Sequence, residues 1–457
     1  MAESWDISAD GLTYTFHLRE GVMFQPVAGV EYESREVTAA DWVWSMMTYL
    51  SADTEISEHP EYLASIVGAP EFTEGAGEVT EVEGINVVDD YTLELTLSEP
   101  NHRFLYDLIN VYVVPQEAFE TVEEFGNNPV GTGPYMLGEW LRDDHLTLTA
   151  NPEYWEAGLP LTSEVRFLNI ADANTELLMY RENELDLLLN FPTGQFNALK
   201  TEFVNEYHEM PGLNVRYYGF KMDVGFFSEN PLVRQAMAHA VNNEEIWNIL
   251  LEGQRVPGTM GVLSPSMPAA NAGTQTYDPA LAAELLTEAG FPGGEGLPTF
   301  DLYILGSMAS SPAHEAMQAQ FAEIGVPVNL VVEDGATYWD HIDQDDVEFF
   351  VSGWSSDFND PSEVLNFLFL DGADQTHYNN EEVNALIREA MTITDPTERE
   401  AIYRQAHEMI MAETPWIVSS YSIISYLQKS WVDGFTITPS GTYTAELKYV
   451  SVAEGQG

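Results

Sequence analysis

Strand-like and helix-like segments alternate between residues 300 and 332, and this order restricts the possible folds more than any other feature of the sequence. Phe300–Leu305 has the pattern of a strand, Ala313–Ile324 has the spacing of a helix, and Pro327–Val332 returns to a strand pattern. A strand, a helix and a second strand in this order are typical of a βαβ unit. We therefore expect a layered α/β fold in this part of the chain.

The chain is longer than one hydrophobic core usually supports. It has 457 residues, of which 45% are hydrophobic and 12% aromatic, whereas single cores stop growing at about 250–300 residues. We therefore expect two or three domains. The most apolar runs, Leu105–Pro115 and Trp416–Leu427, fall short of the roughly 18 uninterrupted apolar residues of a membrane span. We interpret both runs as buried strands.

Acidic residues dominate the charge of the chain. There are 75 Asp and Glu against 16 Lys and Arg, which gives a net charge of −59, and the acids are scattered along the whole sequence. Self-repulsion on this scale opposes compact folding at low ionic strength, but in about 1 M salt the Debye length falls to about 3 Å. A halophilic source explains this composition. Since no basic stripe is present, nucleic-acid binding is not expected.

Motifs for catalysis and for cofactor or metal binding are missing. The chain has no Cys, which excludes disulfides and thiolate sites, and its ten His residues are well separated. It has no phosphate-binding GxxxxGK motif, no HExxH and no GxSxG. We therefore expect a binding protein, not an enzyme, with no catalytic residue, no metal and no cofactor.

Local patterns predict several further elements. Leu12–Leu18 alternates apolar with polar residues, as a half-buried strand does, and Thr38–Leu50 has helical spacing. Thr38 and Asp41 resemble a capping box at the start of that helix. Glu71–Gly84 is rich in Gly and Glu, and we expect a loop there. Helices are also predicted after Pro231, from Asp278-Pro279 to Gly290, and at Glu381–Thr392 and Thr397–Glu413, with strands from Ile417 onward.

One segment suggests a binding site. Phe349–Pro361 begins as an apolar strand and continues into Gly353-Trp-Ser-Ser-Asp-Phe-Asn-Asp-Pro361. In open α/β sheets, ligands bind in the crevice where the strands end. An aromatic face, hydroxyls and a carboxylate at such a place suit an amine-bearing or hydroxyl-rich solute. The alternative is structural: Trp354 belongs to the core and Asp357 caps the next helix.

Several short motifs occur in a consistent order along nearly the whole chain. They are Asp10–Val22, Asn128–Tyr135, Asn151–Trp155, Pro231–Ala236, Tyr277–Gly290 and Gly353–Pro361. Taken together, they resemble the extracytoplasmic solute-binding proteins of ABC importers, in family 5, which includes dipeptide-, oligopeptide- and nickel-binding proteins. Members begin with a signal peptide, usually a lipid-attached Cys, and the first strands of lobe one. We therefore expect this chain to be an N-terminally truncated, halophilic archaeon-like member.

The resemblance implies an α/β, periplasmic-binding-protein-like two-lobed fold of class II, with an extra subdomain in lobe one. Residues 1–125 would form that subdomain without its N-terminal strands. Residues 126–225 would form lobe one, 226–431 lobe two, and 432–457 the return to lobe one.

The resemblance also implies a function. The chain would capture a peptide or a similar small polar solute in a cleft between the lobes and deliver it to the permease subunits of an ABC importer. We expect an extracellular, cell-surface-associated monomer, held at the membrane through the permease or a missing lipid anchor, with the export signal absent from this chain. Alternatives are a sensor or a sugar-binding protein of the same fold, a glycan-active enzyme, and a metal carrier using His341 and His377.

The resemblance assigns roles within the candidate loop. In peptide-binding relatives, the Asp of this loop pairs with the ligand's ammonium group, a role that falls to Asp357 here. The ligand-binding residues expected on this basis are Trp354, Ser355, Ser356, Asp357 and Phe358. Some peptide binders have an Arg where this chain has Val351, and Arg234 lies in a packed helix. The sequence therefore identifies no cation for a ligand carboxylate.

Overall fold

The computed structural model describes residues 1–26, 34–51, 60–75, 79–101, 103–122, 124–192, 194–272, 275–309, 311–343, 347–393, 395–441 and 445–453. The chain divides into two compact units. Unit 1 consists of Met1–Ala171, Trp431–Phe435 and Glu446–Gly457, and unit 2 of Asp172–Ser430 and Thr436–Ala445. The four-part division expected from the sequence, with its first boundaries at 125/126 and 225/226, stays a prediction.

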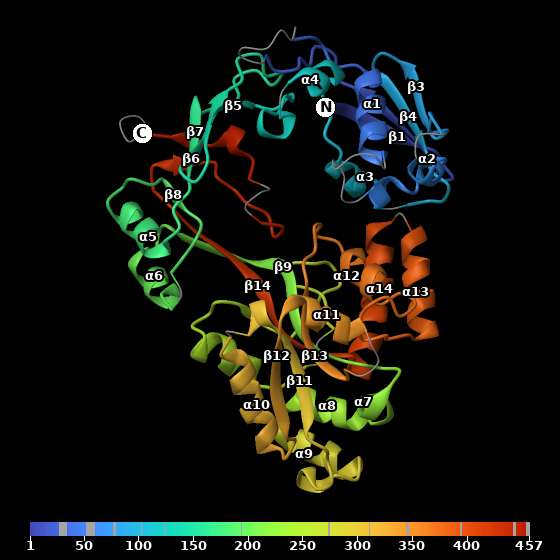
Figure 1. Cartoon of the computed structure of the whole chain (residues 1–457), viewed down its shortest axis with the longest axis vertical. Coiled ribbons are helices and arrows are strands. Elements are labelled where there is room, and N and C mark those ends of the chain that lie inside the picture. The colour runs from blue at the N-terminus through green and yellow to red at the C-terminus, as the bar shows by residue number, and fades with distance from the viewer. Residues whose placement is uncertain are drawn as a thin grey trace. The chain divides into compact units, whose positions relative to one another are not determined.

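Unit 1 contains a four-stranded antiparallel sheet in the order β1-β2-β4-β3 (Figure 1). Its strands are β1 (Ala2–Ile7), β2 (Thr13–Leu18), β4 (Thr92–Thr96) and β3 (Ile85–Asp89). The predicted alternation in β2 is confirmed, because Tyr14, Phe16 and Leu18 are buried. They share a hydrophobic cluster with Met46 and Leu50 of α1 (Ala39–Leu50). Burial of one face of the strand against one face of the helix holds this part of the unit together.

The start of α1 shows the predicted capping box. The backbone N–H of Thr38 donates to Asp41 Oδ2 at 2.8 Å, and the reciprocal contact is also present. Two other predictions were wrong. Glu71–Glu74, the start of the segment expected to be a loop, belongs to helix α2 (Ala69–Glu74), which has a Pro in its first turn, whereas residues 79–84 contain no helix or strand. Leu105–Pro115 starts within helix α3 (Phe104–Asp107) and contains no strand, since a short apolar run does not distinguish a buried strand from a buried helix.

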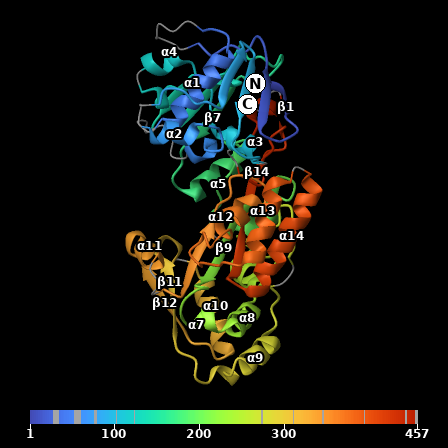
Figure 2. The ribbon, with the colours of Figure 1, turned by 90° about the vertical axis from the view of Figure 1, so that its right-hand side faces the viewer.

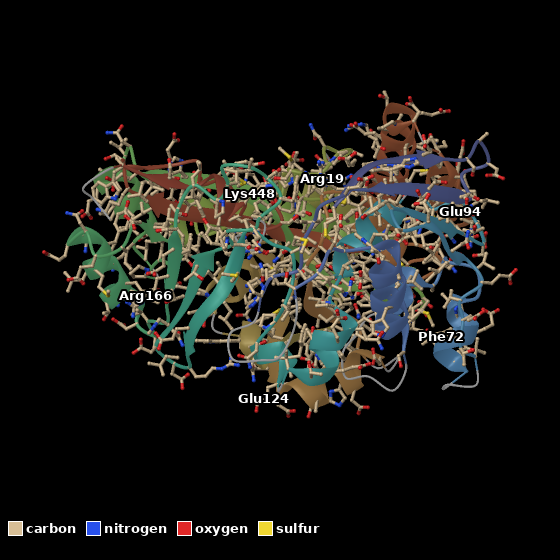
Figure 3. All side chains as sticks on the ribbon, turned by 90° about the horizontal axis from the view of Figure 1, so that it is seen from above. Arg19, Phe72, Glu94, Glu124, Arg166 and Lys448 are labelled. Atoms are coloured by element: carbon tan, nitrogen blue, oxygen red, sulfur yellow. The ribbon has the colours of Figure 1, made fainter. Side chains whose placement is uncertain are left out.

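Segments from both ends of the chain meet in unit 1. A three-stranded antiparallel sheet is formed by β5 (Tyr135–Leu141), β6 (His145–Ala150) and β7 (Glu164–Leu168), while β15 (Val432–Asp433) pairs with β16 (Ser451–Val452); α4 is Gln116–Thr121. Burial and the nearby charges of Arg19 and Lys448 (Figure 3) lower the pKa of the Met1 amine, and Lys448 Nζ is 2.8 Å from Glu156 Oε2. The N–H of Leu161 donates to the carbonyl oxygen of Lys448 at 3.0 Å. These bonds attach the C-terminal segment to the unit.

Unit 2 is built on a mixed sheet in the order β10-β14-β9-β13-β11-β12, with β8 beside β14. Its strands are β8 (Leu187–Leu188), β9 (Tyr207–Phe220), β10 (Val256–Pro257), β11 (Phe300–Leu305), β12 (Val328–Glu333), β13 (Phe349–Trp354) and β14 (Trp416–Gln428). β11 runs parallel to both β12 and β13, while β9 is antiparallel to β13 and β14. With α10 (Ala313–Glu323) between β11 and β12, the predicted strand–helix–strand order is confirmed.

Helices cover both faces of this sheet. The long helices α13 (Glu381–Thr392) and α14 (Pro396–Glu413) lie side by side in both views (Figures 1 and 2) and share a cluster with Tyr217 of β9. Tyr218 belongs instead to the cluster that contains residues of α8 (Pro231–Ala240), α9 (Pro279–Glu288) and α10. Neighbouring strand residues point to opposite faces, so β9 contributes to both cores. The other helices are α5 (Ala173–Arg181), α6 (Phe196–Glu202), α7 (Gly225–Glu229), α11 (Gly335–Asp343) and α12 (Ser362–Leu368).

A buried histidine joins α14 to the loop after β10. His407 is fully buried, its Nδ1 lies 3.0 Å from the carbonyl oxygen of Ala269, and its Nε2 accepts the N–H of Val262 at 2.9 Å. The Cβ of any residue at position 261 would collide with His407 Nε2, which explains Gly261. Burial lowers the pKa of His407 to about 4. The neutral imidazole is therefore part of the native packing.

This histidine should make unit 2 sensitive to acid. Because the folded-state pKa of about 4 lies below the ordinary 6.5, its contribution is present above pH 6.5 and is lost as the pH falls through 4. In His407→Gln we expect a smaller loss of unfolding free energy between pH 6.5 and 4, by up to about 3 kcal/mol. Urea unfolding in concentrated KCl across this range measures the difference. Equal losses in parent and variant would contradict the assignment.

Candidate functional site

The candidate loop begins where β13 meets β9 closely. Gly353 is paired with Arg216 and Trp354 with Val215. A Cβ at position 353 would lie 2.8 Å from the carbonyl oxygen of Val215 and 3.5 Å from Cγ of Arg216. Glycine therefore allows the two strands to approach at the point where the chain leaves the sheet. The loop continues from Ser355 to Pro361, and α12 follows.

The five predicted residues are contiguous but differ in exposure. Ser355 and Asp357 are exposed, Trp354 is half-buried, and Ser356 and Phe358 are buried. The Trp354 ring stacks on that of Phe367, with centroids 6.2 Å apart and an interplanar angle of 29°. Ser355, Asp357 and one part of Trp354 are thus accessible to a solute, whereas Ser356 and Phe358 support the loop from inside.

The backbone of the loop is held by two carboxylates. The N–H of Asp357 donates to Glu363 Oε2 at 3.0 Å, and Glu363 is buried. At the start of α12, Asp360 Oδ1 accepts a hydrogen bond from the backbone N–H of Ser362 at 3.0 Å. Asp360 Oδ2 lies 2.5 Å from Nη2 of Arg399, with only 4% and 16% of these side chains exposed. Asp360, and not Asp357 as the structural alternative proposed, therefore accepts the hydrogen bond at the start of α12. Asp360 also attaches the loop to α14.

A second group of polar residues lies beside the start of this loop and was not identified from the sequence. Arg216 is paired with Ser420 of β14 as well as with Gly353, and Arg255 Nε donates to Ser420 Oγ at 2.7 Å. Trp247 lies 5.9 Å from the guanidinium carbon of Arg255, measured to the ring centroid. Nothing in their local sequence marks these residues, because only the pairing of β9 with β13 and β14 brings them together.

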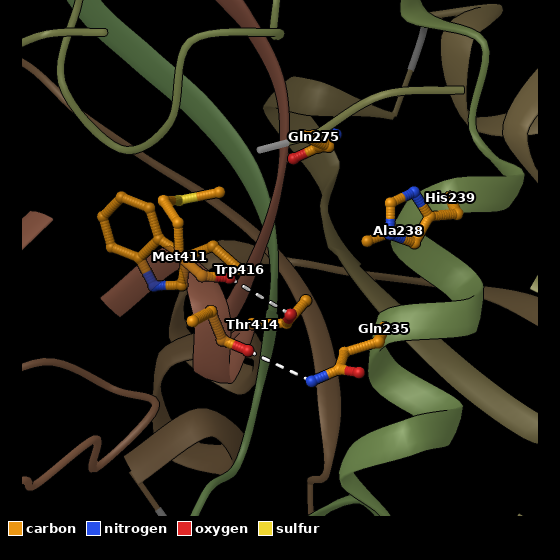
Figure 4. Close-up of a pocket in the computed structure, with 8 residues that line it drawn as sticks. Gln235, Ala238, His239, Gln275, Met411, Thr414 and Trp416 are labelled. Carbon is orange, nitrogen blue, oxygen red and sulfur yellow. Dashed lines mark hydrogen bonds between the residues drawn. The ribbon is translucent and has the colours of Figure 1, made fainter. Parts of the chain in front are cut away.

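A pocket in unit 2 lies away from the candidate loop. It has a volume of about 240 Å³ and lies between α8 and the end of α14 (Figure 4). Gln235 Nε2 donates to the carbonyl oxygen of Ala412 at 3.1 Å across it. Trp416 lines this pocket. It pairs with Gly219 of β9, which also pairs with Phe350 near the start of β13. The candidate loop follows the other end of β13, so none of its residues lines the pocket.

Arg234, which the sequence analysis placed in a packed helix, has a structural role. Arg234 donates to the carbonyl oxygens of Phe227 and Glu413. Burial lowers the pKa of its guanidinium to about 10. Arg234 thus joins α8 to the end of α14 and is not directed at the loop.

The two histidines considered for a metal carrier have separate partners. His341 Nδ1 lies 2.9 Å from Glu333 Oε1, and His377 Nδ1 lies 3.0 Å from Asp223 Oδ2. In the described parts of the chain, no three His, Cys, Asp or Glu side chains are grouped so that they could hold a metal ion.

The helices of these parts also include none with the length and apolar character of a membrane span.

The attachment of the loop to α14 can be tested by removing its cation. Arg399→Met leaves the Asp360 carboxylate buried without its partner, a change that typically costs about 3–5 kcal/mol. We expect urea unfolding to show a loss of about 3 kcal/mol. The control is Arg388→Met, since Arg388 and Asp371 are 53% and 56% exposed and such pairs contribute less than about 1 kcal/mol. Similar losses in both variants would contradict a special role of the buried pair.

Comparisons with known proteins agree on the family. Residues 1–376 match the model described as "Bacterial extracellular solute-binding proteins, family 5 Middle". The chain is similar to heme-binding protein A of Haemophilus influenzae, with 30% identity over 96% of this chain and 82% of the relative. It is also similar to the periplasmic oligopeptide-binding protein OppA of Escherichia coli, with 29% identity over 98% and 84%. The structure of HbpA2 from Haemophilus parasuis is 26% identical over 99% of this chain and 90% of that one, with a TM-score of 0.81. The chain therefore has the two-lobed α/β fold of these proteins and belongs to family 5 of the bacterial extracellular solute-binding proteins.

Proposed function

We propose that the chain is the solute-binding component of an ABC importer and that it captures a peptide or a similar small solute with a free amine. The observation that carries the proposal is the exposed acidic residue Asp357, three residues after the half-buried Trp354, in the loop that follows β13. Family membership supports the class of function, and the oligopeptide-binding relative supports the class of solute.

The loop has the physical properties that such an anchor needs. A carboxylate bonded to an ammonium forms a charge-assisted hydrogen bond, and exclusion of water strengthens it. The aromatic face of Trp354 favours a cation nearby. Because Glu363 holds the N–H of Asp357 and Asp360 holds the chain that follows it, little ordering of the loop is required when a solute binds. Ser355 and Asp357 thus provide polar contacts on a preformed surface.

The proposal includes partners and location. The loaded protein would act outside the cytoplasm, as a monomer, and would deliver its solute to membrane permease subunits. A dissociation constant in the micromolar range corresponds to about 8 kcal/mol of binding free energy, which permits both capture and release. The chain itself would perform no chemistry on the solute.

The anchoring role of Asp357 leads to a test by calorimetry. Asp357→Asn should weaken binding of an amine-bearing peptide by about 2–5 kcal/mol, because one partner of a desolvated charge pair is lost. Binding of mixed tri- to pentapeptides is measured by titration calorimetry and native mass spectrometry, with hemin as a second probe. Asp301→Asn, at another exposed position of unit 2, is the control. Unchanged peptide affinity in Asp357→Asn would show that the anchor lies elsewhere, and binding of hemin alone would overturn the proposed solute class.

We further propose that the protein is adapted to concentrated salt, on the basis of its net charge of −59. The free energy of unfolding should rise between about 0.1 and 1 M KCl, because the Debye length falls from about 10 to about 3 Å and repulsion between carboxylates is screened. Chemical unfolding at each concentration tests this, with sucrose at matched osmolality as the control. A stability that does not change with KCl, or that rises equally with sucrose, would contradict salt adaptation.

A further inference from the structure

Two arginines of unit 2 lack the carboxylate partners that most cations of this unit have. The cations of unit 2 that lie within 4.0 Å of a carboxylate are Arg181, Lys200, Arg388, Arg399, Arg404 and Lys429. In the described part of the chain, neither Arg216 nor Arg255 has such a neighbour. They nevertheless lie close enough for the charge of Arg216 to contribute to lowering the pKa of Arg255, to about 9, with burial as the first cause. The Arg255 guanidinium is therefore still cationic at neutral pH, and the charge of Arg216 repels it.

Hydrogen-bond donors around these arginines also lack acceptors. Nη2 of Arg255 and Nε1 of Trp247 are shielded from solvent, and neither has a partner among the described residues. Trp247 is only 4% exposed. Leaving a buried donor unsatisfied costs about 1–3 kcal/mol, and more for a charged group. Two like charges and two unsatisfied donors in one place are stabilised when an anionic acceptor binds between them.

The space beside Arg216 and Trp247 is small, and Arg255 is not among its lining residues. Arg216 and Trp247 line a cavity of about 10 Å³, together with Val351 and Ser419. A cavity of this size holds about one water-sized group. It therefore admits the terminal oxygen of a ligand and leaves the rest of the ligand outside. The neighbouring His314 supplies no further donor, because its Nδ1 lies 3.1 Å from Tyr218 Oη and its Nε2 lies 3.1 Å from the carbonyl oxygen of Met308.

The cavity adjoins the candidate loop through the sheet. Val351 lies two residues before Gly353 on β13, and Arg216 is the residue paired with Gly353. The missing side chain of Gly353 leaves Cγ of Arg216 only 3.5 Å from the position that a Cβ would occupy. The arginine therefore lies against the strand residue that immediately precedes Trp354 and the loop.

We propose that Arg216, Arg255 and Trp247 form an anion subsite that takes a carboxylate group of the ligand. The subsite rests on the proposed function in one respect, namely that the ligand bound at Asp357 also reaches these residues. Arginine presents its donors in a planar fork that matches a carboxylate. Unit 2 then offers a carboxylate at Asp357 for the ammonium group and two guanidinium groups for the carboxylate, which selects solutes that carry both charges.

The first test compares two peptide libraries. Mixed tripeptides with free C-termini and the same tripeptides with C-terminal amides are offered to the parent, Arg216→Met, Arg255→Met and the control Arg388→Met, and the retained peptides are quantified by mass spectrometry. We expect the parent and the control to prefer the free acids by about tenfold or more, as the loss of a charge-assisted pair predicts. Both test variants should lose this preference while still retaining amides. An unchanged preference in both variants, or a parent that retains free acids and amides equally well, would overturn the subsite.

A second measurement separates failure of the subsite from failure of the proposed function. Potassium acetate replaces potassium chloride at constant ionic strength, and unfolding by urea is followed without any peptide. The subsite predicts a saturable stabilisation of the parent by acetate that both arginine variants lose. If no tripeptide is retained but this stabilisation is present, the peptide class is wrong and the anion subsite stands. If the acetate effect is equal in parent and variants, the subsite is wrong whatever peptides bind.

Discussion

The pairing of β9 with β13 on one side and β14 on the other determines the arrangement of the candidate site. It places Gly353, Arg216 and Ser420 next to one another across three strands. Because side chains alternate between the two faces of a sheet, a shift of the register by one residue would turn Arg216 to the opposite face. Burial of both faces prevents such a shift. Tyr217 stacks on Trp416 on one side, with centroids 3.5 Å apart, while Tyr218 packs with Phe349 on the other.

The loop after β13 receives its shape from the surrounding sheet and helices. Asp360 joins it to Arg399 of α14, and Glu363 of α12 receives the N–H of Asp357. Acidic side chains thus have two kinds of role within a few residues. Asp360 and Glu363 are buried, whereas Asp357 is exposed in the loop that we propose as the binding site. Composition alone does not separate these roles, because the chain contains 75 acidic residues.

The chain contains few cations, so the partners of each cation bear directly on function. With 16 Lys and Arg in the chain, most cations of unit 2 are used in ion pairs or, like Arg234, on backbone carbonyls. Arg216 and Arg255 differ in having each other, Ser420 and Trp247 as neighbours. The proposed salt adaptation and the proposed carboxylate subsite therefore concern the same two arginines.

Local patterns in the sequence determined much of the secondary structure. The Thr38–Asp41 cap, the alternating strand β2 and the β11–α10–β12 order follow from short-range spacing, and all three were predicted correctly. The same reasoning failed at Leu105–Pro115 and at Glu71–Glu74, where tertiary contacts selected helix for ambiguous segments. The candidate loop was predicted because its residues are contiguous. Arg216, Arg255 and Trp247 are separated in sequence, and only the order and register of the strands bring them to one place, so the tertiary structure alone decided that grouping.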